Sequence, residues 1–422
     1  MDSLNQNKTL WENMKEVGMQ KFLAPAALVI LYVFFGLFGR NFFSYSTLVN
    51  ILDSSYYIGF ISIGVTFVII TGGIDLSCGT VMMCATIIGG TAYKTWGWPM
   101  GPSLILILVI ATAFGFFNGI MVSRLKLPPF IATLGTMMIS MGVGSIVSNV
   151  RSATFPTRSN ADGWFKNMFK YITEDRISIP MGAIILFGVA IIAFLILTKT
   201  KMGRYTFAIG SNKEAARLSG VNVVKWEMMA YVVSGFCAGI GGIAFAAVYT
   251  TVMPAQGQGF ELYAIAGAVI GGTSLSGGIG SVFGTMIGVY IMSVLRAGLP
   301  SMDLQAHFQT FFTGVVVIGA VLLDIYRNKK ASEVRILTPA DAYKTQILEN
   351  IAGLKAQIAA AEPGTDTTGL KNEITDAKRD LKTTYSRMRS EEKAEKLKII
   401  ADEKAAERDF HLQAKMKLAR KD

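Results

Sequence analysis

The chain has 422 residues; half of them are hydrophobic and only 16% are charged. Its formal net charge of +11 is unevenly placed: residues 1–330 carry a net +9 at low charge density, whereas residues 331–422 hold 18 basic and 16 acidic side chains. This composition predicts a membrane domain followed by a soluble tail. Because the basic excess belongs to the membrane part, cytoplasmic loops and anionic lipid explain it, and we expect no nucleic-acid partner.

The motifs that would indicate an enzyme are missing from the sequence. There is no GxxxxGK[ST] phosphate loop, so the chain cannot bind ATP in the Walker manner. No HExxH, CxxC, GxSxG or paired-carboxylate site stands out, and His307 and His411 are the only histidines. We therefore expect no catalytic residues, no metal site and no cofactor bound by this chain.

Ten apolar runs are long enough, or nearly so, to cross about 30 Å of hydrocarbon. They predict an all-α, polytopic membrane domain at residues 22–330, preceded by a cytoplasmic segment at residues 1–21. Basic residues such as Arg124, Lys126 and Lys330 then obey the positive-inside rule, with both termini in the cytoplasm. The expected spans are 22–39, 55–72, 78–93, 103–123, 130–149, 181–198, 226–249, 260–273, 278–296 and 308–326.

A short charged segment lies between the sixth and seventh spans, in a loop at residues 199–225. It has the sequence SNKEAARLSGVNV, with helix-forming residues from Lys213 to Leu218 followed by Gly220. The basic residues around it indicate the cytoplasmic side. A short exposed helix that begins with an acid and ends at a glycine is suited to dock into a groove on a partner. The alternative is a capped loop without a partner.

An internal repeat is indicated by two similar segments, GGIDLSCG at residues 72–79 and GGTSLSGG at residues 271–278. Six predicted crossings separate them, so the two halves would run in the same direction. Many transporters build their path between such repeats, and glycine-interrupted helices at matching positions mark it. The candidate path residues are Gly72, Gly73, Asp75, Ser77, Gly271, Gly272, Ser274 and Ser276.

Asp75 is the notable residue of the first copy, because a carboxylate at this depth in a membrane requires a role. We favour the interpretation that Asp75 or Ser77 caps the helix that follows, since Ser274 of the second copy is also a capping residue. The alternative is that Asp75 lines the substrate path.

Aromatic rings could line the transport path. The candidates lie near span ends, where aromatic residues are also common without any such role. They are Phe130, Tyr249, Phe260 and Tyr263.

The tail, residues 331–422, is expected to form a cytoplasmic helical hairpin or coiled coil. Thr338, Pro339 and Asp341 are typical of a helix start, and Pro363–Gly364 would end the first helix. A single long, partly solvated helix is the alternative. For the hairpin, we expect a frayed distal end and two apolar stripes: Ile347, Ile351, Leu354 and Ile358 at coiled-coil spacing, then Leu370, Ile374, Ala377, Leu381 and Met388.

Four blocks of the sequence resemble permease subunits of ribose-, galactose- and xylose-type sugar ABC importers. They occur in colinear order within residues 20–330: GVTFVIITGGIDLSCGTV (64–81), LPPFIATLGTM (127–137), GRYTFAIGSNKEAARLSGVNV (203–223) and ELYAIAGAVIGGTSLSGGIGSVFGTMIG (261–288). Cys78 departs mildly from the family pattern, and the tail is not part of it.

The resemblance implies partners and a coupling role. The partners would be cytoplasmic ATPase subunits that use ATP and Mg, an extracytoplasmic sugar-binding protein, and a second permease copy, as a homodimer in a bacterial cytoplasmic membrane. The pattern E-A-A-x-x-x-G matches the coupling loop of ABC-importer permeases. The implied ATPase-coupling residues are Glu214, Ala215, Ala216, Arg217 and Gly220.

We therefore expect the transmembrane subunit of an ATP-driven importer of a monosaccharide, a ribose-like pentose or a hexose. An importer of a nucleoside or another sugar-like ligand is an alternative. A secondary carrier or channel is another; against it, the spans contain almost no charge apart from Asp75, whereas ion-driven carriers need intramembrane charge. A mere anchor for the tail would not need ten spans.

Overall fold

The computed structural model describes residues 20–175, 177–332, 339–360 and 366–418. The chain divides into two compact units, residues 1–330 and residues 331–422. Most of the predicted N-terminal segment 1–21, the helix-start residue Thr338 and the predicted break at Pro363–Gly364 lie outside the described residues.

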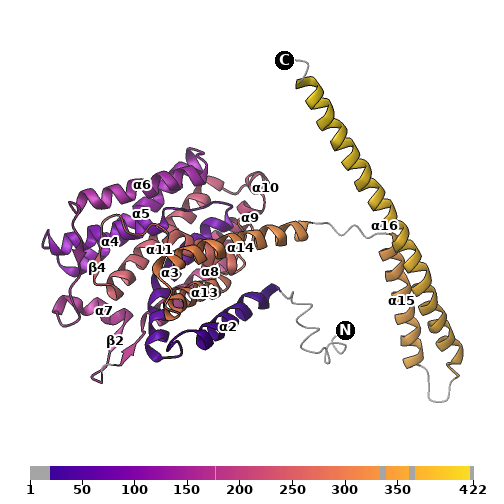
Figure 1. The fold of residues 1–422 in the computed structure, drawn as a ribbon, viewed down its shortest axis with the longest axis horizontal. Coiled ribbons are helices and arrows are strands. Elements are labelled where there is room, and N and C mark those ends of the chain that lie inside the picture. The colour runs from indigo at the N-terminus through magenta and orange to yellow at the C-terminus, as the bar shows by residue number, and fades with distance from the viewer. Residues whose placement is uncertain (1–19, 176, 333–338, 361–365, 419–422) are drawn as a thin grey trace. The chain divides into compact units, whose positions relative to one another are not determined.

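The first unit is an all-α bundle, and each predicted span overlaps one of its apolar helices (Figure 1). Among the described residues, seven helices are long and apolar enough to cross a membrane, whereas α4 has 17 residues and the apolar parts of α2 and α12 are shorter still. The expected polytopic all-α class is confirmed. The apolar helices are α2 (Gln20–Phe38), α3 (Tyr45–Ile70), α4 (Cys78–Lys94), α5 (Met100–Gly119) continued by the π-helical turn η1 (Ile120–Arg124), α6 (Pro129–Val147), α8 (Gly182–Lys199), α11 (Val223–Val248), α12 (Phe260–Ile270), α13 (Val282–Ser301) and α14 (Ala306–Ser332).

α3 is the central helix of the bundle, and its whole hydrophobic stretch is buried against α8, α11, α12 and α13. It begins at Tyr45, well before the expected start at residue 55. Polar residues near the start of the helix made it look too hydrophilic for a span, but inside the bundle these residues have ion-pair and hydrogen-bond partners. Asp53 pairs with Lys170 at 2.6 Å, and the hydroxyls of Ser54 and Ser55 donate to carbonyls one turn earlier in the helix.

Small residues bring α5 and α11 into close contact. A Cβ atom at Gly115 would collide with the carbonyl of Tyr231, and one at Gly235 would collide with the carbonyl of Ala111. Membrane helices associate through such small-residue faces because lipid offers no hydrophobic driving force between helices.

The two sides of the bundle carry different short elements (Figure 1). On one side, the connection between α6 and α8 folds into the 3-10 turn η2 (Ala161–Gly163), α7 (Trp164–Phe169) and short strands. β1 (Ala153–Thr154) pairs antiparallel with β4 (Thr251–Val252), and β2 (Tyr171–Ile172) pairs with β3 (Ser178–Ile179). On the other side lie α9 (Lys201–Ser211) and α10 (Lys213–Leu218).

The second unit is an antiparallel hairpin of α15 (Pro339–Ala360) and α16 (Thr368–Leu418). Ile351 and Ile374 are buried between the helices, as the apolar stripes predict. The backbone N–H of Ala340 donates to Glu392, and the hydroxyl of Tyr343 donates to Asp380, a hydrogen bond that lowers the pKa of this carboxyl. The hairpin is confirmed over the alternative single helix. Fraying was wrongly expected, because α16 stays helical to Leu418 with its strong helix formers Ala, Glu and Lys.

Replacing Ile351 and Leu354 together by lysine should open the hairpin. Ile351 is 5% exposed and Leu354 is partly buried, so two ammonium groups would enter an apolar interface at a cost of about 3 kcal/mol or more. Hydrogen exchange of α15 amides in the full chain measures the effect. Leu348→Lys is the matched control, since that side chain is 46% exposed and should keep native protection. Unchanged protection in the double variant would show that this face does not hold the hairpin.

Candidate functional site

The predicted helix Lys213–Leu218 is present as α10, and it is capped at both ends. The Asn212 side chain accepts a hydrogen bond from the N–H of Ala215 at 2.9 Å, which places the cap one residue before the helix. At the other end Gly220 has a φ of 82° and donates to Arg217, while Val221 donates to Ala216. This is the Schellman arrangement, which favours glycine because other residues are strained there.

One face of α10 holds it to the bundle and the other faces outward. Ala216 packs with Ile209 of α9 and Val223 of α11. Lys213 donates to both oxygens of the buried Glu227 of α11, at 2.7 and 2.9 Å. The outward face carries the ion pair between Glu214 and Arg217, the methyl of Ala215, and Leu218, which is 83% exposed. α10 is therefore held against the bundle on one side, and its outward face exposes the apolar side chain of Leu218.

The first candidate helix break separates α3 from α4. α3 ends in a Schellman arrangement in which Gly72, with a φ of 80°, donates to Ile69 and Gly73 donates to Val68. Asp75 follows and is 2% exposed. Its Oδ1 accepts from the backbone N–H and the hydroxyl of Ser77, at 2.9 and 2.7 Å.

This geometry corrects one detail of the predicted cap. Ser77 is the residue that precedes α4, but its side chain accepts no hydrogen bond from the first turn of that helix. Asp75 instead accepts the N–H of Ser77 itself, one step before the helix begins. The carboxylate thus stabilises the turn before α4 and does not cap the free N–H groups of that helix.

Asp75 also anchors a polar chain that joins four helices. Its Oδ2 accepts from Ser234 of α11 at 2.7 Å. Ser77 accepts from the side-chain amide of Asn118 in α5 at 2.8 Å, and Asn118 accepts from Thr136 of α6 at 2.6 Å. Because hydrogen bonds inside a membrane have no water to replace them, this chain fixes α5, α6 and α11 around the start of α4.

The second candidate break, between α12 and α13, repeats the first with a shift of one residue. Gly272 takes the left-handed φ of 94° and donates to Val269, so it corresponds to Gly72; the sequence pattern had aligned Gly72 with Gly271. The polar turn keeps the predicted register, since Ser274 accepts from the N–H of Ser276 at 3.2 Å as Asp75 does from Ser77.

A carboxylate serves the second turn as well, but it comes from α14. Asp324 accepts from the N–H of Leu275 at 3.0 Å and from the hydroxyl of Ser274 at 3.3 Å. Each copy therefore has a carboxylate at this turn. Asp75 belongs to the turn of the first copy, whereas Asp324 reaches the turn of the second copy from α14.

The two breaks meet beside α9. The N–H of Gly278 donates to the carbonyl of Ile70 at 2.9 Å, and a Cβ atom at Gly210 of α9 would collide with both groups. Thr66 and Thr285 are hydrogen-bonded at 2.8 Å between α3 and α13. α10 follows α9 almost immediately, so one short connection separates it from the helix that contacts both breaks.

The spans contain more charge than expected, and the prediction that they hold almost no charge apart from Asp75 is wrong. The other charged residues could have been identified in the sequence, because each is a single charged residue inside an apolar run. Buried carboxylates occur in α3, α11, α12 and α14, and a partly buried guanidinium in α13: Asp53, Glu227, Glu261, Asp324 and Arg296.

Three of the four candidate aromatic residues gather near Arg296. Its guanidinium lies 5.6 Å from the ring centres of Phe260 and Tyr263 and 5.7 Å from that of Tyr57. Tyr249 stacks beside Tyr57, with their ring centres 6.0 Å apart. We refer to these residues, Arg296, Tyr57, Tyr249, Phe260 and Tyr263, as the arginine box.

Phe130 is not part of the arginine box. It lies in the first turn of α6 and is 54% exposed, and no ring contact joins it to another aromatic residue among the described ranges. Its position fits the alternative interpretation, an aromatic residue at the membrane interface.

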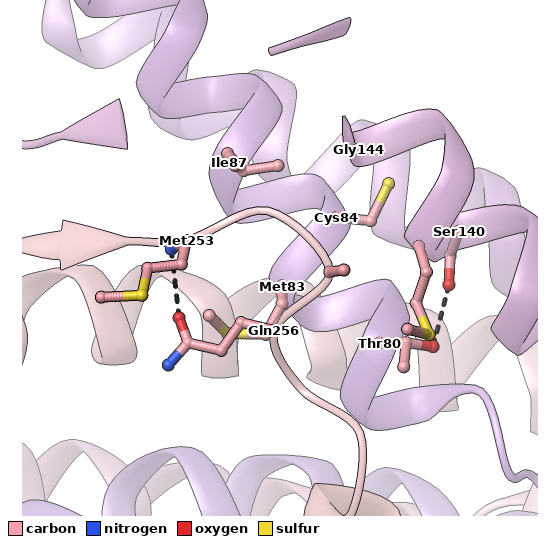
Figure 2. A pocket seen from close by; sticks show the side chains of 10 residues that line it. Thr80, Met83, Cys84, Ile87, Ser140, Gly144, Met253 and Gln256 are labelled. Carbon is pink, nitrogen blue, oxygen red and sulfur yellow. Dashed lines mark hydrogen bonds between the residues drawn. The ribbon is translucent and has the colours of Figure 1, made fainter. Parts of the chain in front are cut away.

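A cavity of about 380 Å³ adjoins the arginine box. Arg296 and Tyr249 line it together with hydroxyl and amide side chains from α3 and α13, which include Thr47, Asn50, Ser54 and Ser301. A second cleft, between α4, α6 and the loop after β4, leaves no room for a water molecule. Figure 2 shows Met253 and Gln256 of that loop beside Met83 of α4.

Charged residues also tie the α6–α8 connection to the bundle. Lys170 pairs with Asp53, and Lys166 donates to the hydroxyl of Thr250 at 2.9 Å. Burial, together with the nearby charge of Arg158, lowers the pKa of Lys166 to about 8. In the described part of the chain no group of three or more His, Cys, Asp or Glu side chains could hold a metal ion.

Comparison with known proteins assigns the family. A model described as the permease component of branched-chain amino acid transport systems matches residues 47–321. The chain belongs to this permease family. The permease is 34% identical to a ribose import permease of Haemophilus influenzae over 304 residues, which cover 72% of this chain and 93% of that protein.

Other sugar permeases are similar to this permease as well. A fructose import permease of Rhizobium meliloti is 32% identical over 325 residues, covering 74% of this chain and 89% of the relative. A xylose transport system permease of Haemophilus influenzae is 29% identical over 371 residues, covering 75% and 99%. No solved structure matches the permease. The resemblance to sugar importer permeases is confirmed, and the protein is a multi-pass membrane protein.

Proposed function

We propose that this permease is the membrane subunit of an ATP-driven importer of a monosaccharide. The relatives support the sugar class, because their names specify import or transport of ribose, fructose and xylose. α10 supports the coupling to ATP. It is the observation that carries the proposal, since a capped helix with an exposed face is linked through α9 to both helix breaks.

An ATPase subunit would bind the outward face of α10. Glu214, Ala215, Arg217 and Leu218 supply that face, while Ala216 supports the helix from behind and Gly220 sets its end. ATP and Mg belong to the partner subunit, so the permease contributes only the surface that moves. A second copy of this chain would complete the path, as a homodimer.

The basic residues support an orientation with α10 in the cytoplasm. α9 and the start of α11 carry exposed Lys201, Arg204 and Lys225, and Arg124 ends η1, which packs against α11. By the positive-inside rule this side and both termini face the cytoplasm of the bacterial inner membrane. The opposite side, with α7 and the strands, then faces the extracytoplasmic sugar-binding protein.

Transport in proteoliposomes tests the proposal. The permease, reconstituted with its ATPase and binding protein, should take up at least one neutral monosaccharide only when ATP is present on the α10 side. Collapsing proton and sodium gradients should have no effect. The buried charges in the spans make this control necessary, because they would suit an ion-driven carrier. Uptake that follows an ion gradient without ATP would establish the carrier, and uptake of nucleosides alone would change the substrate class.

A further inference from the structure

Arg296 is a partly buried cation without a carboxylate partner among the described residues. It lies in α13, five residues before the helix ends, and packs against the rings of Tyr57, Phe260 and Tyr263. No described carboxylate lies within ion-pair distance of it, and no described residue accepts a hydrogen bond from its guanidinium. Placing a charged group inside a membrane protein costs free energy. A guanidinium whose N–H donors have no protein partner there points to a ligand that accepts from them.

Two residues of the arginine box, Arg296 and Tyr249, line the cavity of about 380 Å³ described above. The cavity wall beside Arg296 carries short polar side chains that can donate and accept, those of Thr47, Asn50, Ser54 and Ser301. Arg296 and Tyr249 therefore face the same space as these short polar side chains.

These groups suit a neutral polyhydroxylated ligand. A sugar presents hydroxyl oxygens that accept from a guanidinium and hydroxyls that donate to side-chain oxygens. Its C–H faces pack on aromatic rings, as in small-molecule sites that combine apolar walls with a few polar groups. The second cation of the cavity, Arg40, is already paired with Asp303 at 2.7 Å. The lining therefore offers one unpaired charge, and the remaining polar groups match neutral hydroxyls.

We propose that the arginine box is the site where a monosaccharide first binds the permease, with Arg296 as the residue that holds its hydroxyls. This inference rests on the proposed transport function. The binding protein supplies affinity outside the membrane, and the arginine box receives the released sugar at the entrance of the path. Arg296 then affects how many sugars cross per ATP and not how fast ATP is hydrolysed.

The test uses the complete transporter in proteoliposomes, with uptake of a neutral monosaccharide and binding-protein-stimulated ATP hydrolysis measured together. Arg296→Met should lower the sugar transported per ATP by about 10-fold or more, the loss expected when a hydrogen bond to a charged group is removed, and should leave ATP hydrolysis within about twofold. Arg296→Lys should recover part of the loss. Arg40→Met is the matched control, since Arg40 lines the same cavity but is paired and exposed, and it should behave as wild type.

An unchanged ratio of sugar to ATP in Arg296→Met would overturn the inference and leave the proposed function intact. So would an equal fall of uptake and hydrolysis, which would mean a purely structural role. If Arg296→Met does not fold, Tyr249→Phe decides, because Tyr249 lines the cavity with Arg296 and loss of its hydroxyl should still lower the ratio measurably; no change would overturn the inference. Dependence on Arg296 for a sugar acid but not for a neutral sugar would overturn the ligand class. A wild-type transporter that moves no sugar would refute the proposed function itself.

Discussion

Gly220→Val should nearly abolish transport while the protein still inserts in the membrane. Gly220 has a φ of 82°, and a Cβ atom there would meet open space, so the cost is backbone strain and not a clash. A β-branched residue in this region is strained by about 1–3 kcal/mol. α10 has only six residues and cannot absorb that strain, so its last turn should unwind and displace Arg217 and Leu218. We expect uptake and binding-protein-stimulated ATP hydrolysis to fall by about 10-fold.

Gly220→Asn is the matched control for this prediction. Asparagine tolerates the left-handed region better than any other residue except glycine, so this variant should keep most of the activity. Copurification of the ATPase subunit distinguishes loss of docking from loss of coupling. Normal uptake and normal stimulated hydrolysis in Gly220→Val would refute the coupling role of the segment.

Asp75→Leu should destabilise the membrane domain strongly, and Asp75→Asn should not. The carboxylate accepts three hydrogen bonds, two from Ser77 and one from Ser234. Leucine would leave these buried donors unpaired, at about 1–3 kcal/mol each. Asparagine keeps one oxygen for Ser77, and its amide can donate to the Ser234 hydroxyl, which can then donate elsewhere in its helix. Thermal unfolding of the purified permease in detergent measures the difference.

Uptake by the asparagine variant separates the two roles considered for Asp75. If the side chain orders the turn, Asp75→Asn should transport close to the wild-type rate. If its charge lines the path, the same variant should lose transport with normal thermal stability. Its burial at 2% exposure and its satisfied hydrogen bonds favour the first role.

The features that depend on neighbouring residues could be predicted from the sequence. α10 was placed at Lys213–Leu218, because a cap before a helix and a glycine after it act over a few residues. The membrane spans followed from hydropathy, which is also local, and the tail hairpin from its apolar spacing. The start of α3 was missed because its polar residues have partners that hydropathy does not consider, such as Lys170 for Asp53.

The candidate site depends on tertiary contacts between distant segments. Ser234 reaches Asp75 across 159 residues, and Arg296 joins Tyr57 and Phe260 only after α3, α12 and α13 have packed. The repeat shows the same limit. The amino-acid pattern of the repeat aligns Gly72 with Gly271. The helix before each turn, however, decides which glycine takes positive φ, and in the second copy that glycine is Gly272. Composition and spacing thus determined the class of this protein and the position of the short helix α10. Only packing decided which polar groups are satisfied and which, like Arg296, are left for a ligand, because a buried group finds its partners through space and not along the chain.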